Sequence, residues 1–440
     1  MAWLVKGARL LDPARGIDRV GDVLIDGGKV ERVGGEIRAD GEPAVLDAKG
    51  LVLTPAFVDM HVHLREPGRE DAETIESGVR AAAAGGFGAV ACMPNTDPPL
   101  DSHGSIRFVL ERAAEAGPVE VLPIGCVTLG GKGERLAEIG DLVRAGAVAI
   151  SDDGSWVASA LLMRRALEYS RMFDIPVVSH AEEPKLSGGG VMHEGEMSLR
   201  LGLRGIPAES ETIAIDRDVR LAELTRGRLH IAHVSTAGGV EIVRRAKERG
   251  LPVTAETAPH YLALTDRCLA GYDTNRKMNP PLRTAEDRDA LRAGVAEGVI
   301  DAIATDHAPH PAHEKEVEFD AAPFGVVGLE TALAVLLTYV VRSGHLSLPR
   351  LVESLTSAPA KIIGHDLPGI VAGAPASLVL FDPEGSWVVD PSRFESLSRN
   401  TPFAGERLFG EVRDLFLAGE RITPSPKSGG EFLFPDEEAK

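Results

Sequence analysis

Residues 56–64 read AFVDMHVHL, a short apolar run that ends in two histidines, His61 and His63. Seven further apolar runs rich in Val, Ile and Ala follow it; they begin at residues 87, 119, 147, 175, 228, 251 and 299. Short continuous runs of this kind indicate strands that are buried on both faces. Amphipathic helical patterns such as 72–86 and 236–250 lie between the runs, and several of them end in glycine, a common helix stop.

This alternation predicts the fold of the central part of the chain. Eight strand–helix units over about 300 residues are the number and length typical of a (β/α)₈ barrel, also called a TIM-like barrel. We therefore predict an α/β fold with such a barrel over residues 55–365. An open, doubly wound sheet produces the same alternation and is the alternative at this point.

Both ends of the chain are β-rich instead. Residues 1–54 contain the hairpin signal DVLID-GG-KVERV at 22–33, two alternating runs joined by Gly-Gly. Residues 366–422 show similar short β-type runs. The last segment, 423–440, is rich in Pro, Gly and Ser and then acidic, so we expect a mobile C-terminal tail.

The composition narrows the possible partners and the compartment. The 440 residues include 47 Lys+Arg and 66 Asp+Glu, which gives a net charge of −19. Such a charge repels nucleic-acid phosphates and anionic lipid, and no apolar run approaches the roughly 20 residues that span a bilayer. The first residues lack a signal-peptide pattern, and three scattered cysteines predict no disulfide framework. We therefore expect a cytoplasmic protein with a small-molecule ligand and with no nucleic-acid or membrane partner.

Polar side chains recur at the ends of the predicted strands. His61 and His63 are two residues apart on a strand, so their side chains point to the same face. Four other residues end or follow later runs: Asp153, His180, His233 and Asp306. Barrel active sites are built at the carboxyl ends of the strands. Four imidazoles and two carboxylates in that position predict a divalent-metal site, with zinc as the preferred ion.

Arg65 and Asn95 point to the nature of the substrate. Arg65 follows His63 by two residues, so its side chain faces the same end of the barrel. Its planar guanidinium suits a carboxylate. A surface ion pair with Glu66 or Glu70 is the alternative for this arginine. Asn95, after the second run, can donate to the same carboxylate.

Eight segments together resemble a known family. They are FVDMHVHLREPG, ACMPNTDPP, SDDG, HAEE, HVST, KMNPPLR, ATDHAPH and PFGVVGLE. On these segments the chain resembles the amidohydrolase superfamily and, within it, the type I dihydroorotases, over essentially the whole length. The resemblance implies a metal-dependent barrel and a small β-sandwich domain assembled from the N- and C-terminal segments.

Carried over by position, the resemblance assigns the metal shell. Its members are His61, His63, Asp153, His180, His233 and Asp306. Asp153 would bridge two metals where many relatives use a carboxylated lysine, although Asp152 could compete for this role. Ile150 and Ser151 leave no lysine there, which favours a dihydroorotase over hydantoinases and allantoinases and leaves open whether one or two Zn²⁺ ions bind. His260 and His307 are expected as hydrogen-bonding neighbours of the ligands.

The resemblance also implies the substrate contacts and the reaction. The contact residues are His63, Arg65, Asn95, Asn279 and His310, with the backbone of Phe324 and Gly325. The reaction would be the reversible hydrolysis of L-dihydroorotate to N-carbamoyl-L-aspartate in pyrimidine biosynthesis. Metal-activated hydroxide would attack the ring amide, with Asp306 as general acid and base. The charged segment 311–325 is expected to form a mobile lid.

Two other functions are compatible with the sequence. A hydantoinase- or allantoinase-type cyclic amidase would share the fold, but it conflicts with the missing lysine and with the Arg65–Asn95 pair. A non-catalytic scaffold for aspartate carbamoyltransferase should have lost metal ligands, whereas every ligand position here is filled. A homodimer and an active complex with that transferase are both open.

Overall fold

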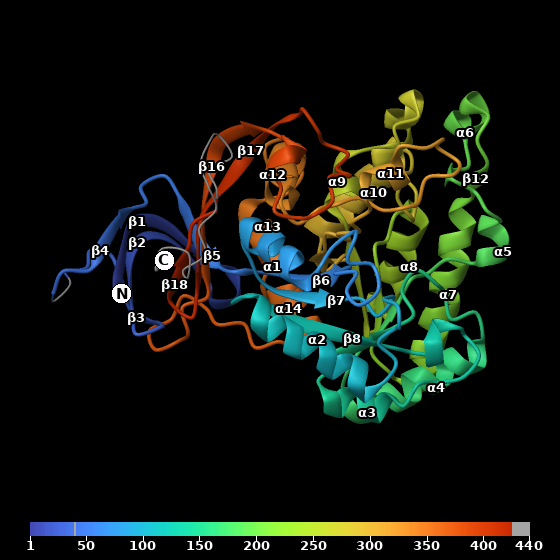
Figure 1. Ribbon diagram of the computed structural model, residues 1–440, viewed down its shortest axis with the longest axis horizontal. Helices are drawn as coiled ribbons and strands as arrows, with labels where there is room; N and C mark the ends of the chain where they lie inside the picture. Colours follow the sequence, from blue (N-terminus) through green and yellow to red (C-terminus); the bar gives the residue numbers. More distant parts are fainter. Residues whose placement is uncertain (39–40, 425–440) are drawn as a thin grey trace.

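The computed structural model describes residues 1–38 and 41–424. Its centre is a barrel-shaped sheet of eight parallel strands that are adjacent in chain order (Figure 1). The strands are β6 (Phe57–Val62), β7 (Phe87–Cys92), β8 (Glu120–Cys126), β9 (Ala149–Ser151), β10 (Val177–Ser179), β13 (Leu229–Ile231), β14 (Val253–Thr257) and β15 (Ala302–Ile303). Each of them lies in one of the eight predicted apolar runs.

Helices follow the strands and cover the outside of the barrel (Figure 1). The longer ones are α1 (Ile75–Ala84), α2 (His103–Ala116), α3 (Ile139–Ala145), α4 (Ala160–Ser170), α7 (Ala208–Thr225), α8 (Ala237–Glu248), α10 (Ala285–Ala296), α13 (Leu348–Leu355) and α14 (Ser357–Ile363). Shorter elements lie in the connections: α5 (Pro184–Ser187), β11 (Met192–His193), α6 (Glu196–Leu201), β12 (Gly205–Ile206), α9 (Pro259–Ala263), α11 (Ala312–Lys315) and α12 (Ala332–Leu336). A Ser or Thr side chain caps six of the nine longer helices, namely α1, α2, α4, α8, α10 and α13. At the start of α1, Thr74 Oγ1 accepts from the Ser77 amide.

The two ends of the barrel sheet, β6 and β15, are not joined by a regular ladder. An isolated parallel bridge links Val62 to His307, and the His63 amide donates to the His307 carbonyl at 2.8 Å. We call this contact between β6 and β15 the seam. In the seam, the buried Asp59 carboxylate also accepts from the amides of His61 and Thr305, each at 3.1 Å. A side-chain carboxylate thus takes the place of the missing ladder bonds. The result is a nearly closed barrel, so the predicted barrel is confirmed and the open sheet is excluded.

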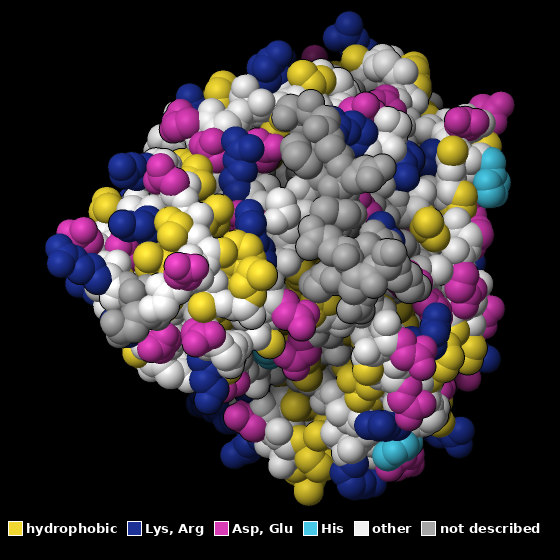
Figure 2. Space-filling model, turned by 60° about the vertical axis from the view of Figure 1, so that its left-hand side comes forward, with side chains coloured by type: hydrophobic (Ala, Val, Ile, Leu, Met, Phe, Trp, Pro, Cys, Tyr) yellow, Lys and Arg dark blue, Asp and Glu magenta, His cyan; other side chains and the backbone are white. Residues whose placement is uncertain are grey.

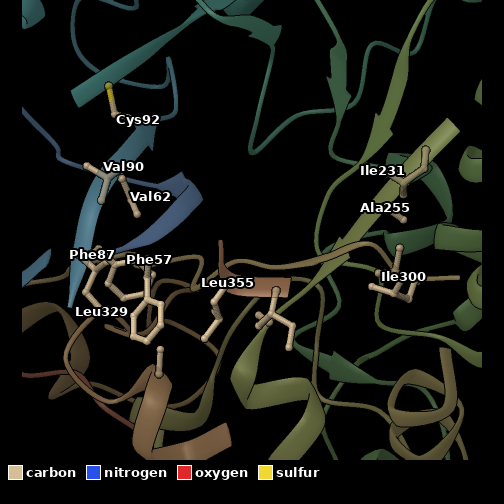
Figure 3. Packing of buried hydrophobic residues seen from close by; sticks show 14 of the residues in the cluster. Phe57, Val62, Phe87, Val90, Cys92, Ile231, Ala255, Ile300, Leu329 and Leu355 are labelled. Atoms are coloured by element: carbon tan, nitrogen blue, oxygen red, sulfur yellow. The ribbon is translucent and has the colours of Figure 1, made fainter. Parts of the chain in front are cut away.

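The strand side chains alternate between two apolar layers. Phe57 and Phe87 point outward and pack beside Leu329 in the layer between strands and helices (Figure 3). Their ring centroids lie 5.7 Å apart in an edge-to-face arrangement. Val58 and Met60 point inward, into a second cluster in which seven of the fifteen buried residues are alanine. This densely packed double layer holds the strand ends, and therefore the residues that follow them, in fixed positions.

The two ends of the chain meet in a second sheet beside the barrel (Figure 1). Its strands are β1 (Trp3–Asp12), β2 (Ile17–Asp26), β3 (Lys29–Gly34), β4 (Ala44–Asp47), β5 (Val52–Pro55), β16 (Leu378–Val388), β17 (Arg407–Leu417) and β18 (Glu420–Ile422). Antiparallel pairing of β5 with β16 joins the N- and C-terminal segments. Val30 of β3 and Phe416 of β17 belong to one buried cluster, so the sheet curls over its own core. The expected extra β domain from both termini is therefore present, as one continuous sheet.

Smaller predictions about the chain ends have mixed outcomes. The Gly-Gly hairpin is confirmed, because Gly27 and Gly28 join β2 to β3 and both have positive φ. The domain limits at 54/55, 365/366 and 422/423 stay predictions. Residues 425–440 of the expected mobile tail lie outside the described residues.

The surface agrees with the charge pattern of the sequence. On the face drawn in Figure 2, Lys and Arg side chains are interspersed with Asp and Glu. Among the described residues, no helix has both the length and the apolar character needed to cross a membrane.

The seam makes a prediction about stability. Replacing Asp59 with alanine leaves two buried amides without acceptors, which we expect to lower the free energy of unfolding by about 2–4 kcal/mol. Chemical denaturation followed by circular dichroism measures this loss. The matched control is Asp216→Ala on the outer surface, where the carboxylate pairs only with Arg220 one turn away; it should change stability by less than about 0.5 kcal/mol. Equal effects of the two substitutions would show that Asp59 does not hold the seam.

Candidate metal-binding active site

The Asp153 carboxylate lies at the centre of the carboxyl end of the barrel. Its Oδ1 is 3.5 Å from His61 Nε2, 3.7 Å from His180 Nδ1 and 3.7 Å from His233 Nε2. Its Oδ2 is 3.6 Å from His63 Nε2. One carboxylate therefore faces four imidazoles that come from three different strand ends.

Asp306 brings a second carboxylate to the same cluster. Its Oδ1 lies 3.1 Å from His63 Nε2 and 3.6 Å from His61 Nε2. Two buried groups of three donor atoms could each hold a metal ion: His61, Asp153 and His233, and His61, His63 and Asp306.

The donor atoms fit a divalent cation. His61 Nε2 and Asp153 Oδ1 are buried and have no hydrogen-bond partner among the described residues. Buried polar atoms rarely lack a partner, so the arrangement needs a group that these atoms can bind. Imidazole nitrogens and carboxylate oxygens are common ligands of zinc.

Backbone geometry turns several of these side chains inward. Arg65, His233 and Asp306 all have positive φ angles, of 62°, 34° and 49°. L-residues with side chains adopt this region infrequently, and such strain is concentrated at functional sites. Here each strained residue lies just beyond a barrel strand, where the chain leaves the sheet.

Hydrogen bonds set which nitrogen of each histidine faces the cluster. His61 Nδ1 lies 2.7 Å from Glu256 Oε1, and His63 Nδ1 lies 2.9 Å from Asn95 Oδ1. Since both partners accept, each Nδ1 carries a proton, and the Nε2 atoms are the ones that face the cluster. Burial would raise the pKa of Glu256, but hydrogen bonds from His230 and His61 lower it to about 2.

The pKa values of the cluster show how strongly its charges interact. Burial by itself would lower the pKa of His61, but the Asp153 charge raises it well above the usual value. The pKa of His180 rises to about 10 against the same opposition from burial, chiefly through its interaction with the nearby Asp153 carboxylate. Conversely, the imidazoles hold the pKa values of Asp153 and Asp306 well below the ordinary range despite burial. Both carboxylates are therefore ionised at neutral pH.

The neighbouring aspartate is not part of the cluster. Asp152 points to the adjacent loop, where its carboxylate accepts from the amide of Thr128 at 3.0 Å and from its hydroxyl at 2.5 Å. Of the two candidates in the sequence, Asp153 is the one that faces the histidines. Ile150 and Ser151 are buried in β9, and no lysine takes the place of Asp153.

Arg65 lies at the mouth of the cluster without an acidic partner. Its Nε donates to the Pro309 carbonyl at 3.1 Å, and no carboxylate of the described residues lies within ion-pair distance of it. The alternative of a surface ion pair is not realised, because Glu66 binds Arg112 and Glu70 accepts from a loop amide. Burial lowers the pKa of Arg65 to about 10, so the guanidinium stays charged at neutral pH. An unpaired, partly buried cation of this kind favours an anionic ligand.

A cavity of about 230 Å³ brings the predicted residues together. Eleven of the twelve line it: His63, Arg65, Asn95, Asp153, His180, His233, Asn279, Asp306, His310, Phe324 and Gly325. The twelfth, His61, is fully buried beneath it. A cavity of this size suits a small molecule.

Two predicted contact residues have protein partners in this structure. Asn279 Nδ2 donates to Glu182 at 2.7 Å. The His310 ring lies between Glu314, 2.9 Å from Nδ1, and the Phe324 carbonyl, 2.8 Å from Nε2. Burial and the charge of Arg65 lower the pKa of His310 to about 4, although Glu314 beside the ring acts in the opposite direction.

Comparison with known proteins is consistent with this geometry. The family model described as "Dihydro-orotase-like" matches residues 50–238. A protein named "Dihydroorotase" from Syntrophotalea carbinolica is 53% identical over 426 residues, which cover 96% of this chain and 99% of that protein. Another of the same name, from Pelobacter propionicus, is 51% identical over 96% of this chain and 99% of its own length.

The chain belongs to the dihydroorotase family. Solved structures with the same fold include the L-hydantoinase (dihydropyrimidinase) of Arthrobacter aurescens, with a TM-score of 0.87, 27% identity and coverage of 98% of this chain and 97% of that chain. The dihydropyrimidinase of Brevibacillus agri has a TM-score of 0.84 at 24% identity over 98% of this chain and 96% of its own, a likeness of fold. The family also implies metal use, in agreement with the donor cluster.

Some residues of this dihydroorotase-family site were missed by sequence reasoning. Glu256, which orients His61, and Asp59, which closes the seam, are both acids inside apolar strand runs, and this signal was available. Glu73 had no such signal: it lies 3.2 Å from His307 Nε2 and anchors that ring away from the cluster. His307 instead supports the site through its carbonyl, whereas His260 Nε2 is buried without a partner among the described residues.

The two adjacent aspartates provide a matched test of metal binding. We expect Asp153→Asn to lose most of the metal bound per subunit, because the amide removes the negative charge that faces four imidazoles. Asp152→Asn should keep it, since that carboxylate bonds to Thr128. Elemental analysis of the dialysed proteins measures both. Equal metal content in the two variants would remove Asp153 from the ligand set.

Proposed function

We propose that this chain catalyses the reversible hydrolysis of L-dihydroorotate to N-carbamoyl-L-aspartate, a step of pyrimidine biosynthesis. One observation carries the proposal: a buried cluster of four imidazoles and two carboxylates shares a small cavity with the unpaired guanidinium of Arg65. The cluster suits the activation of water, and the guanidinium suits the carboxylate of the substrate. Relatives named dihydroorotase, at 51–53% identity over nearly the whole chain, support the same activity.

The proposed metal is zinc, with one or two ions per subunit. The residues that would hold it are His61, His63, Asp153, His180, His233 and Asp306. A bound divalent ion would supply a nucleophilic water near neutral pH and would polarise the amide carbonyl.

In this proposal Asp306 moves the proton. It is ionised at neutral pH because the charges of His61 and His63 lower the pKa of its carboxyl. It can therefore accept the proton of the attacking water and then give it to the departing ring nitrogen. In the direction of ring closure the same carboxylate takes the proton from the nitrogen and returns it to the leaving water.

The mouth of the cavity would bind and orient the substrate. Arg65 has free guanidinium N–H groups for its carboxylate. The Oδ1 of Asn95 is engaged with His63, which leaves its Nδ2 group to donate to the same carboxylate. His310, Asn279 and the Phe324–Gly325 backbone also line the cavity and would contact the ring amides.

The alternative function is that of a hydantoinase-type cyclic amidase, because the fold is also similar to that of the Arthrobacter aurescens L-hydantoinase. Two features count against it: Ile150 and Ser151 stand where a bridging lysine would be expected, and Arg65 offers a charge for a carboxylate. The scaffold alternative conflicts with a ligand set in which every position is filled. A homodimer, a complex with aspartate carbamoyltransferase and a cytoplasmic location remain predictions from the sequence.

The experiment that tests the proposal measures turnover of L-dihydroorotate with the metal content quantified. We expect activity in the purified protein, its loss after chelation and its return with zinc. Hydantoin and allantoin are assayed in parallel and should be poor substrates. Preferred turnover of either would assign the alternative function. A metal-loaded protein inactive on all three substrates would contradict catalysis by the chain alone.

Two substitutions separate chemistry from binding. Asp306→Asn should lower kcat by about 10²–10⁴-fold while substrate binding persists, because the amide cannot accept the proton. Arg65→Ala should instead raise KM by about 10–100-fold with less effect on kcat, since it removes charge-assisted hydrogen bonds to the substrate. Steady-state kinetics and metal analysis of each variant check both. A near-normal kcat in Asp306→Asn would exclude the acid–base role, and an unchanged KM in Arg65→Ala would exclude the carboxylate contact.

A further inference from the structure

Two lysines are buried beside the active site without a carboxylate partner. Lys277 and Lys315 have exposed fractions of only 2% and 4%, and neither makes an ion pair with the described residues. Burial lowers the pKa of Lys277 below its usual value and that of Lys315 to about 7. Burying two ammonium groups is costly, so their contacts must provide a compensating interaction.

Both ammonium groups bind backbone carbonyls of one segment, residues 319–325. Lys277 Nζ donates to the carbonyls of Phe319, Asp320 and Ala322 at 2.7, 3.1 and 2.6 Å. All three donors of this ammonium group are thereby used.

Lys315 continues the same pattern closer to the cavity. Its Nζ donates to the carbonyls of Pro323 and Gly325 at 2.9 and 3.0 Å, and to the Lys277 carbonyl at 3.4 Å. The Gly325 amide donates back to the Lys277 carbonyl at 2.9 Å. The segment therefore accepts hydrogen bonds from both lysine side chains and donates one to the backbone of Lys277.

Residues 319–325 have no helix or strand of their own to satisfy these carbonyls. Five of the seven carbonyls accept from the two lysines, and that of Phe324 pairs with His310 Nε2 at 2.8 Å. Such donors matter where the loop is buried, as at Phe319, Ala322 and Gly325, because backbone groups there have lost water. Lys277 Nζ also lies 4.7 Å from the centroid of the Phe324 ring and so contacts the side chain of a cavity-lining residue.

We propose that Lys277 and Lys315 are positioning residues: their ammonium groups hold residues 319–325 in place and thereby set the position of the Phe324–Gly325 wall against the substrate. The substrate part of this inference rests on the proposed function. The lysines lie behind the wall and do not line the cavity themselves. Loosening them should therefore affect substrate binding more than the chemical step.

The test uses Lys277→Met and Lys315→Met in the full chain. Methionine keeps most of the side-chain volume and removes all three donors. The control is Lys361→Met, an exposed lysine of α14 for which the structure shows no hydrogen bond or ion pair. We expect KM for dihydroorotate to rise at least 10-fold in both buried-lysine variants, with kcat and metal content within about 3-fold of the parent.

A second readout does not depend on catalysis. Chymotrypsin cleaves after phenylalanine, and Phe319 is buried in the anchored segment, with 5% exposure. Cleavage after Phe319 should be at least 10-fold faster in the two variants than in the parent and in Lys361→Met. This assay also tests the lid expected at 311–325, because a mobile lid would be cut rapidly in the parent without ligand.

The outcomes are distinguishable. KM and cleavage within 2-fold of the parent would overturn the proposal, as would a lower kcat with unchanged KM and cleavage. If a methionine variant does not fold, as judged by circular dichroism, Lys315→Gln replaces it, because the amide keeps two donors and should show a smaller change in the same direction. If the parent itself fails to turn over dihydroorotate, the proposed function fails, and the cleavage rates alone decide whether the lysines hold the segment.

Discussion

A charge buried in a protein must be met by opposite charges or by hydrogen bonds, and this requirement shapes the carboxyl end of the barrel. Asp153 lies 3.5–3.7 Å from ring nitrogens of four histidines, and Asp306 faces two of the same rings. None of these side chains could be buried there alone. Attraction between the carboxylates and protonated imidazoles stabilises the cluster, and a cation can bind the same converging atoms once it displaces the ring protons.

The residues behind the cluster satisfy the same requirement one layer further out. Glu256 and Asn95 accept the Nδ1 protons of His61 and His63 and so direct the opposite nitrogens inward. Asp59 joins the two edge strands of the barrel by accepting from amides on either side of the seam. Orientation of His61 and closure of the barrel therefore depend on buried carboxylates, whereas His63 is oriented by the amide of Asn95 at the cavity. Substitutions in this layer should be felt both in stability and in metal binding.

The part of the cavity formed by Phe324 and Gly325 is held in place by hydrogen bonds to its backbone rather than by strand ends. Here an irregular segment supplies backbone groups, and two buried lysines supply the donors that hold it. The ends of barrel strands carry the metal side, whereas this wall is held by the side chains of Lys277, in a loop, and of Lys315, at the end of α11. A wall of this kind can change without disturbing the barrel.

The sequence by itself determined the barrel and the extra β domain from the two chain ends, through the alternation of apolar runs and amphipathic helices and the β-type runs at both ends. The spacing of His61 and His63 and the polar residues at the run ends also predicted the candidate metal ligands. The candidates Asn279, His310, Phe324 and Gly325 came from the family resemblance and not from a local signal. Tertiary structure alone decided which of Asp152 and Asp153 faces the histidines, because the two residues are adjacent and follow the same predicted strand. It also decided that Arg65 has no acidic partner and that Glu256 contacts His61, which lies 195 positions away in the sequence. Only the tertiary structure shows that Lys277 and Lys315 bind carbonyls of the same segment. Such contacts depend on where distant strands and loops meet in space, and no local pattern encodes that distance.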